Sequence, residues 1–88
     1  MYVLGIKPAL RKKLEKLGKK NSKQADIVSK KVEEILKNPH RYKNLRKPLQ
    51  EWKRVHIDRS FVLTFSIDEN KKKIILEDYD HHDKIYKR

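Results

Sequence analysis

WKRVHIDRSFVLTFSIDENKKKIILEDY, residues 52–79, is the stretch of the chain that decides its fold. Near its start, Val55 and Ile57 alternate with Arg54 and His56, which is the two-residue period of a strand with one buried face. The rest is rich in β-branched and aromatic residues, interrupted by short polar segments typical of turns. Short connections favour antiparallel neighbours. The predicted strands are residues 52–58, 61–67 and 72–79.

The first half of the chain predicts a strand, two helices and a loop. Residues 2–6 mix β-branched and aromatic side chains, as short strands do. Pro8 suits the first turn of a helix, and leucines then recur at helical spacing. Ser22 is the expected N-cap of a second helix, which has one apolar stripe and ends before Pro39. The expected helices are residues 8–20 and 22–37, and residues 38–51 are expected to form an ordered loop.

The predicted order of elements is therefore β-α-α-β-β-β in a single domain, residues 1–88. This order indicates an α+β fold, in which a helical hairpin packs on one face of a small, mainly antiparallel sheet. The other face carries Arg54 and His56. We expect that face to stay open and to receive a ligand.

Positive charge is the second strong feature. The chain has 24 Lys and Arg against 12 Asp and Glu, which gives a net charge of +12. Residues 1–50 hold 15 of the basic and 4 of the acidic side chains. Such a field attracts partners rich in phosphate or carboxylate groups. A surface adapted only for solubility has a similar composition, so charge by itself does not indicate catalysis.

Composition also excludes several classes of protein. There is no cysteine, so disulfides and thiolate metal sites are excluded. With only two glycines, the chain has no glycine-rich phosphate loop, and we expect no cofactor. No apolar run approaches the roughly 20 residues that span a bilayer, and the first residues lack the charged leader of a signal peptide. We therefore expect a cytoplasmic protein without membrane contact.

Candidate catalytic residues gather around the first hairpin strand and in the tail. Arg54, His56 and Arg59 form one group, and His82 and Tyr86 belong to the other. Imidazoles beside guanidiniums can cut RNA without a metal. One group takes a proton from a 2′-OH, another protonates the leaving 5′-oxygen, and fixed cations stabilise the charge on phosphorus. A polar strand face of this composition is equally typical of a solvated surface, so both interpretations stay open.

The tail also contains His81-His82-Asp83, which are residue types that bind metals. However, adjacent histidines point in different directions on most backbones, and no second pair of histidines has zinc-finger spacing. We therefore expect no metal site.

Two aromatic residues allow either packing or base stacking. Phe61 alternates with the apolar set of its strand, which favours the core. Trp52 lies where the loop meets the strand, and we favour packing over stacking on a base.

Two segments resemble a known family. LQEWKRVHIDRSFVLTFSID, residues 49–68, is similar to a Trp/Tyr-basic stretch followed by a histidine-bearing strand and an aromatic-Val-Leu strand. HHDKIYKR, residues 81–88, is similar to a His-x-x-x-aromatic ending. With this order and spacing the chain resembles the RelE/ParE toxin superfamily, and within it the YafQ-like branch. The resemblance implies a compact, ribonuclease-like β-α-α-β-β-β fold.

The resemblance also implies an activity and the residues that perform it. Enzymes of the family enter the ribosomal A site and cut mRNA, with the 2′-OH as nucleophile and no metal. His82 matches the catalytic histidine of the tail, His56 a histidine on the second strand, and Tyr86 the closing aromatic. Arg54 falls at a position that contacts phosphate, and we expect Arg59 to assist it. Further RNA contacts are expected from Arg41, Lys43, Arg46, Lys47, Lys53, Phe61 and His81.

Partners follow from the same resemblance. The implied partners are the ribosome, mRNA and an antitoxin whose toxin-binding segment is acidic. The complex of the two proteins is expected to bind operator DNA through the antitoxin.

Three positions depart from the family pattern. Val62 and Asp78 stand where relatives carry arginine, and Ser60 stands where the YafQ-like branch has an acid. The cation that stabilises the transition state must then come from other basic residues of the strand or loop. Two alternatives therefore stay open, namely a ParE-like inhibitor of DNA gyrase and a non-catalytic module that binds antitoxin.

Overall fold

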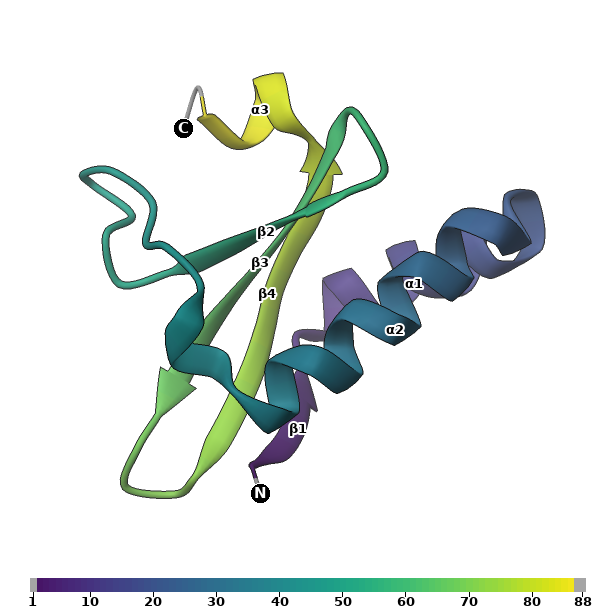
Figure 1. The fold of residues 1–88 in the computed structure, drawn as a ribbon. Coiled ribbons are helices and arrows are strands. Elements are labelled where there is room, and N and C mark those ends of the chain that lie inside the picture. The colour runs from purple at the N-terminus through teal and green to yellow at the C-terminus, as the bar shows by residue number, and fades with distance from the viewer. Residues whose placement is uncertain (1, 87–88) are drawn as a thin grey trace.

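The computed structural model describes residues 2–86 and confirms the predicted α+β fold (Figure 1). A four-stranded sheet is covered on one face by two long helices. The chain also has a short C-terminal helix, which was not predicted. The elements are β1 (Val3–Ile6), α1 (Pro8–Lys20), α2 (Ser22–Lys37), a 3-10 turn (Pro39–Arg41), β2 (Lys53–Ile57), β3 (Phe61–Asp68), β4 (Lys73–His81) and α3 (His82–Tyr86).

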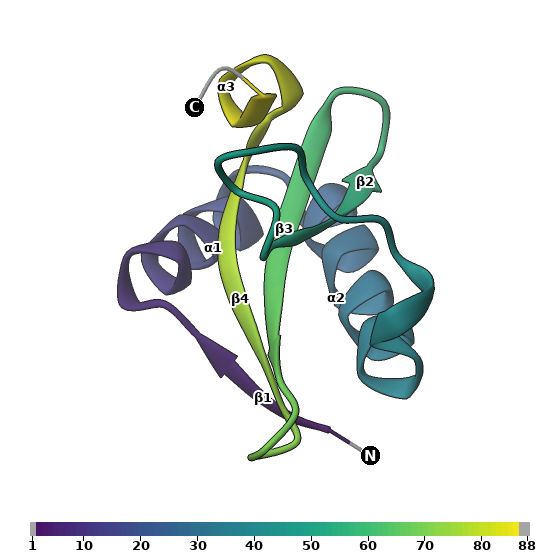
Figure 2. The same ribbon diagram turned by 90° about the vertical axis from the view of Figure 1, so that its left-hand side faces the viewer.

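The sheet is mixed, with the strand order β1-β4-β3-β2 (Figure 2). β1 runs parallel to β4, whereas β4 with β3 and β3 with β2 are antiparallel, as the short connections predicted. β1 pairs with β4 only from Lys73 to Leu76. Within the described residues, the second half of β4 is therefore an edge, and it leads directly into α3.

A β-bulge in β4 changes which of its side chains face the helices. Thr64 of β3 is paired with Asp78, but the next residue, Phe65, is paired with Leu76. Glu77 is thus the extra residue in β4. Because of it, Leu76 and Tyr79 both belong to the core beneath the helices, although they are an odd number of residues apart.

The two long helices have the predicted bounds but a different cap between them. Asn21, not Ser22, caps α2, because its side-chain oxygen accepts a hydrogen bond of 3.1 Å from the Gln24 N–H. Pro8 occupies the first turn of α1, as expected. No helix within residues 2–86 has the length and apolar content that a membrane crossing requires. The buried core between the helices and the sheet contains Leu10, Val28, Ile35, Val55, Ile57, Leu63, Phe65, Ile74, Leu76 and Tyr79.

The face of the sheet away from the helices is partly covered, contrary to the expectation that it stays open. Val62 of β3 is fully buried there, beneath Leu45 of the loop and Ile85 of α3. Leu49 and Trp52 pack around this second core, which confirms the packing role expected for Trp52. The loop and the tail thus fold over this face of the sheet, and the second core holds them there (Figure 2).

A polar network ties the chain together at the end of the sheet opposite to α3 (Figure 1). Glu69 accepts a hydrogen bond of 2.6 Å from the Tyr2 hydroxyl and lies 2.7 Å from His40 Nε2 and 2.8 Å from Lys72 Nζ. The hydrogen bond from Lys72, followed by those from Tyr2 and His40, lowers the pKa of Glu69 from 4.5 to about 2. The network joins the N-terminal segment, the 3-10 turn and the β3–β4 turn.

Candidate active site and RNA-binding surface

A pocket of about 380 Å³ lies between the loop, β2 and α3. Its apolar side chains belong to the second core or pack against it. Its cationic side chains are more exposed to solvent than the buried residues of that core. The lining residues are Leu45, Arg46, Lys47, Leu49, Arg54, Ile85 and Tyr86. A pocket with an apolar floor and exposed cations suits a ligand that carries both a flat ring and an anionic group.

Arg54 and Tyr86 face each other across this pocket. Strand alternation directs Arg54 away from the buried Val55 and Ile57, onto the side covered by the loop and tail. The guanidinium carbon of Arg54 lies 5.7 Å from the centroid of the Tyr86 ring, within the range of a cation–π contact. The backbone N–H of Arg54 donates a hydrogen bond of 3.0 Å to the backbone carbonyl of Lys43, which fixes β2 against the loop.

His82 stands where β4 ends and α3 begins. Its backbone N–H donates to the carbonyl of Ser60 at 2.7 Å, which ties the tail to the β2–β3 turn. Its ring centroid lies 6.3 Å from that of Tyr86, and its side chain is 41% exposed. The expected return of the tail to the sheet is confirmed, and it places Arg54, Tyr86 and His82 in one row of contacts.

His56 and Arg59 lie outside this row. His56 is exposed on β2 opposite Val62, and Arg59 is exposed in the turn that follows. Within residues 2–86 neither side chain lines the pocket. The pairing of His56 with His82 stays a prediction.

The loop of residues 38–51 supplies exposed cations. However, Lys53, which was expected to bind RNA, instead holds this loop in place through its own hydrogen bonds. Lys53 Nζ donates hydrogen bonds of 3.0 Å each to the Tyr42 carbonyl and to Asn44 Oδ1. Arg41 lies over the Tyr42 ring and 3.9 Å from Glu34, so it is partly engaged within the chain. The exposed Lys43 forms no side-chain hydrogen bond or ion pair within the described residues, and Arg46 and Lys47 line the pocket.

Phe61 and His81 lie on the other face of the sheet from Arg54. The Phe61 ring stacks on Tyr79 with centroids 5.3 Å apart and meets His81 edge-on at 5.7 Å. Phe61 also borders a hollow of about 360 Å³ that is lined mostly by α1 lysines and β4. Any RNA contact by these two residues would lie on that face of the sheet and not in the Arg54 pocket.

The structure accounts for two of the departures from the family pattern. Val62 is fully buried beneath the loop and tail, so this position has no access to a phosphate. Lys13 Nζ lies 3.0 Å from Asp78 Oδ1 and 3.4 Å from Asp80 Oδ2, and it also donates to the Tyr79 carbonyl. An arginine in place of Asp78 would repel Lys13. The role of Lys13 was not predicted, because nothing in its sequence environment separates it from the other α1 lysines.

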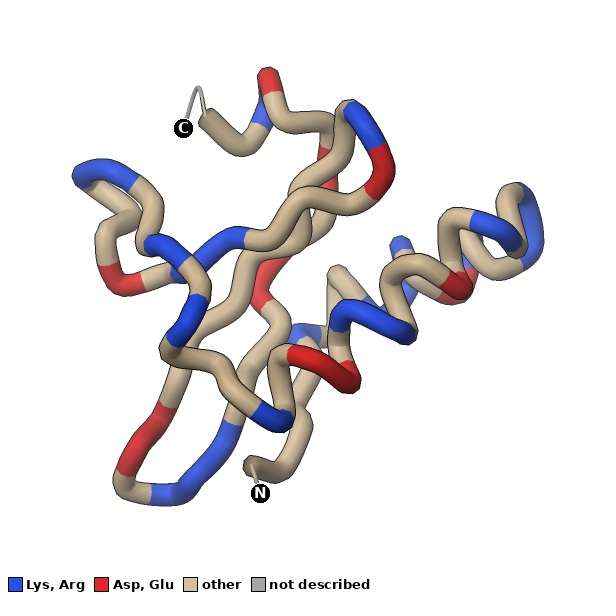
Figure 3. The backbone as a smooth tube through the Cα atoms, in the orientation of Figure 1, with Lys and Arg blue, Asp and Glu red and all other residues tan. Residues whose placement is uncertain are grey.

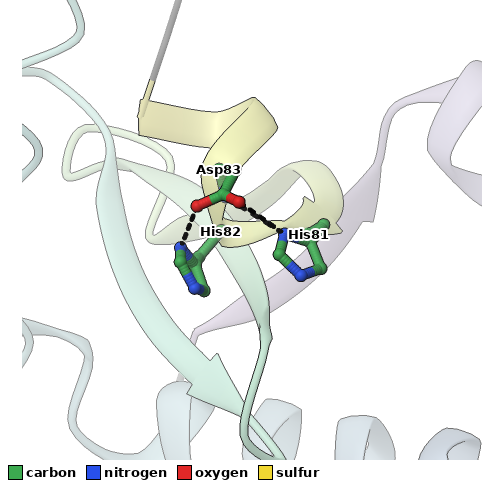
Figure 4. Close-up of side chains that lie close together, drawn as sticks. All are labelled: His81, His82 and Asp83. Carbon is green, nitrogen blue, oxygen red and sulfur yellow. Dashed lines mark hydrogen bonds and ion pairs between the residues drawn. The ribbon is translucent and has the colours of Figure 1, made fainter.

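The three tail residues His81, His82 and Asp83 converge, contrary to expectation (Figure 4). The chain turns from strand to helix between the two histidines, so their rings stack with centroids 4.8 Å apart instead of diverging. The Asp83 carboxylate lies between them, with Oδ1 2.9 Å from His82 Nδ1 and Oδ2 3.7 Å from His81 Nδ1.

Relatives of similar length place the chain in a family. No family model matches it. An uncharacterized protein of Methanosarcina mazei is 62% identical over 86 residues, which cover 98% of this chain and 100% of the relative. A protein of Methanocaldococcus jannaschii named "Putative toxin RelE4" is 57% identical over 88 residues, which cover 100% of this chain and 94% of the relative. The chain belongs to the RelE toxin family.

Solved structures agree with the fold of this RelE family member. The isolated RelE toxin of E. coli matches 100% of the chain with a TM-score of 0.76 and 18% identity, over 98% of its own length. The YoeB–YefM complex of Staphylococcus aureus matches 93% with a TM-score of 0.78 and 14% identity, over 98% of the matched chain. The intact E. coli RelBE complex matches 92% with a TM-score of 0.76 and 19% identity, over 96% of the matched chain. These likenesses confirm the RelE-like fold, whereas the YafQ-like branch stays a prediction.

Proposed function

We propose that this chain is the toxin of a type II toxin–antitoxin module and that it inhibits translation by cutting mRNA on the ribosome. The observation that carries the proposal is the row formed by Arg54, Tyr86 and His82 beside a pocket with exposed cations. Membership of the RelE family supports it, as do the toxin–antitoxin complexes among the structural neighbours.

In the proposed mechanism the RNA chain enters the pocket along the loop. The Tyr86 ring offers a face for a base, and Arg54 holds the scissile phosphate. The ribose 2′-oxygen attacks phosphorus while the bond to the 5′-oxygen breaks, which leaves a 2′,3′-cyclic phosphate and a 5′-OH. His82 transfers one of the two protons. His56 lies on the same face of β2 as Arg54 and is proposed to transfer or position the second.

Basic residues outside the pocket are proposed to bind the rest of the RNA. Lys and Arg dominate the loop and α1, whereas α2 holds four lysines against three acidic residues (Figure 3). Arg46 and Lys47 line the pocket, and we assign them to mRNA together with Arg41, Lys43 and Arg59. The lysines of α1 and α2 are assigned to ribosomal RNA, because phosphate contacts of this kind need no base recognition.

The proposed antitoxin binds a different surface. A hollow of about 290 Å³ lies between β1 and the two long helices, with a mostly apolar lining that includes Leu14 and Val32. Beside it, Val3 is 59% and Leu4 40% exposed on an edge strand. An antitoxin segment with apolar anchors and acidic flanks fits this hollow and the lysines around it. Operator DNA would then be bound through the antitoxin.

Cutting of mRNA in ribosome complexes tests the catalytic proposal. Purified protein added to ribosomes that carry a defined mRNA should produce cuts with 2′,3′-cyclic phosphate and 5′-OH ends. The variant His82→Ala should lose them, whereas His40→Ala, which removes a histidine at the opposite end of the sheet, should cut like wild type. Undiminished cutting by His82→Ala would refute the assignment of His82.

The same assay separates the two alternatives. Growth arrest that persists in a variant with both His56→Ala and His82→Ala, without mRNA cuts, would favour inhibition of DNA gyrase. Tight antitoxin binding without growth arrest or cuts by wild type would favour a non-catalytic module.

A further inference from the structure

We propose that His81, His82 and Asp83 form a binding site for one transition-metal ion of the zinc class. Each residue offers one ligand atom, and these atoms all lie within 4.8 Å of one another. The backbone N–H of Asp83 donates to His81 Nδ1 at 3.3 Å, so this nitrogen carries its lone pair and a bound metal would replace that long hydrogen bond. His82 Nδ1 already lies 2.9 Å from the Asp83 carboxylate. The Asp83 carboxylate lies between the two rings, with one oxygen toward each of them, so small side-chain rotations would bring one ligand atom of each residue to a single ion (Figure 4).

The ligand set selects the kind of metal. Two imidazole nitrogens and one carboxylate oxygen with an open fourth position form the ligand set of open zinc sites, and imidazole also suits copper and nickel. Magnesium and calcium prefer all-oxygen shells and are disfavoured. Ligands about 2.0–2.1 Å from zinc lie roughly 3.4 Å from one another in a tetrahedron, so the widest separation in the cluster, up to 4.8 Å, must shorten by up to about 1.4 Å.

The surroundings allow this contraction. The side chains of His81 and His82 are 40% and 41% exposed, and that of Asp83 is 61% exposed, so rotation of the side chains meets little resistance. Within residues 2–86 no lysine or arginine pairs with the Asp83 carboxylate, and its only ionic partners are the two imidazoles. A divalent ion therefore does not have to displace a competing cation.

The site also has a consequence for activity, which rests on the proposed function. An imidazole with metal on Nδ1 keeps its proton on Nε2 and has no basic lone pair left. His82 in that form cannot accept a proton from the ribose. We therefore expect zinc to act as a reversible inhibitor of RNA cutting.

Calorimetric titration with ZnCl₂ tests the site on the full chain without a histidine tag. Wild type should bind one zinc ion per chain, and a hundredfold excess of Mg²⁺ should leave the titration unchanged. His82→Ala and the nearly isosteric Asp83→Asn should each weaken binding at least tenfold, whereas His40→Ala should bind like wild type. NMR signals of the His81 and His82 rings should change during the wild-type titration, which tests the site without any variant.

Several outcomes would overturn the proposal. These are wild-type affinity in Asp83→Asn, an equal loss of affinity in His40→Ala, or zinc-induced changes confined to other histidines. The inhibitory consequence is tested with pre-formed ribosome–mRNA complexes, where zinc should stop cutting and a chelator should restore it. Continued cutting by zinc-saturated protein would refute only the inhibitory effect of zinc and would leave the metal site unaffected. Absence of cutting by metal-free protein would contradict the proposed function and leave the metal site to be judged by calorimetry.

Discussion

The guanidinium carbon of Arg54 on β2 lies 5.7 Å from the centre of the Tyr86 ring on α3. Both side chains line the pocket between the sheet and the tail. A cation–π contact at an exposed position stabilises by only about 0.5–1 kcal/mol, which is too little to hold a helix of one turn in place. The burial of Ile85, which is 2% exposed in the second core, must contribute most of the stabilisation of the tail.

Replacing Ile85 should therefore detach the tail. Ile85→Ala leaves a cavity beneath Leu45 and should lower the free energy of unfolding by about 2–5 kcal/mol, or abolish the ordered tail if α3 separates first. RNA cutting should fall with it. Denaturant unfolding and NMR of α3 would measure the effect. Val3→Ala, at a position that is 59% exposed, is the matched control and should change stability little.

Two changes at Tyr86 separate its ring from its hydroxyl. Tyr86→Phe keeps the ring beside Arg54 and should retain most of the cutting activity. Tyr86→Ala removes a stacking surface worth about 1–3 kcal/mol per base and should reduce cutting roughly 10- to 100-fold, with little change in stability. Equal activity of the two variants in single-turnover cutting would exclude a role for the ring.

An arginine at position 62, which the family resemblance leads one to expect, should not improve RNA cutting. Val62 is fully buried, so Val62→Arg places an unpaired charge beneath Leu45 and Ile85 at a cost of several kcal/mol. We expect a loss of stability and of activity together. A stable and more active Val62→Arg protein would show that the loop and tail can open without loss of function.

Glu69 should make the stability of the folded chain depend on pH between about pH 4.5 and pH 2. Its pKa is lowered to about 2 in the folded chain, chiefly by Lys72, so its contribution is present above pH 4.5 and is lost as the pH falls toward 2. Thermal unfolding of wild type and Glu69→Gln should differ at pH 6 and converge near pH 2. Glu15→Gln, on the exposed face of α1, should behave like wild type at each pH.

The elements of the fold could be predicted because each leaves a local pattern. Leucine spacing and Pro8 defined α1, and strict alternation defined β2 and β3. The cap of α2 was assigned to Ser22 instead of Asn21, because both residue types cap helices and stand side by side. The bulge at Glu77 has no local signal, since it depends on the pairing of β4 with Phe65.

The site could be predicted only in part, because contacts between distant segments are not written in local patterns. Arg54, His82 and Tyr86 were expected together and do form one row of contacts. Burial of Val62 under the loop was missed, because an alternating strand predicts one buried face and not two. The convergence of His81 and His82 was missed, since it requires the chain to change from strand to helix between them.

The central claim, that Arg54 and His82 act on the same phosphate, is tested most directly by a double-mutant cycle in single-turnover cutting of ribosome-bound mRNA. Arg54→Ala and His82→Ala should each slow cutting about 10²–10³-fold. Groups that act as a unit are strongly non-additive, so the double variant should be little slower than the slower single variant. Losses that multiply in the double variant would mean that the two residues act independently, and this result would contradict the account.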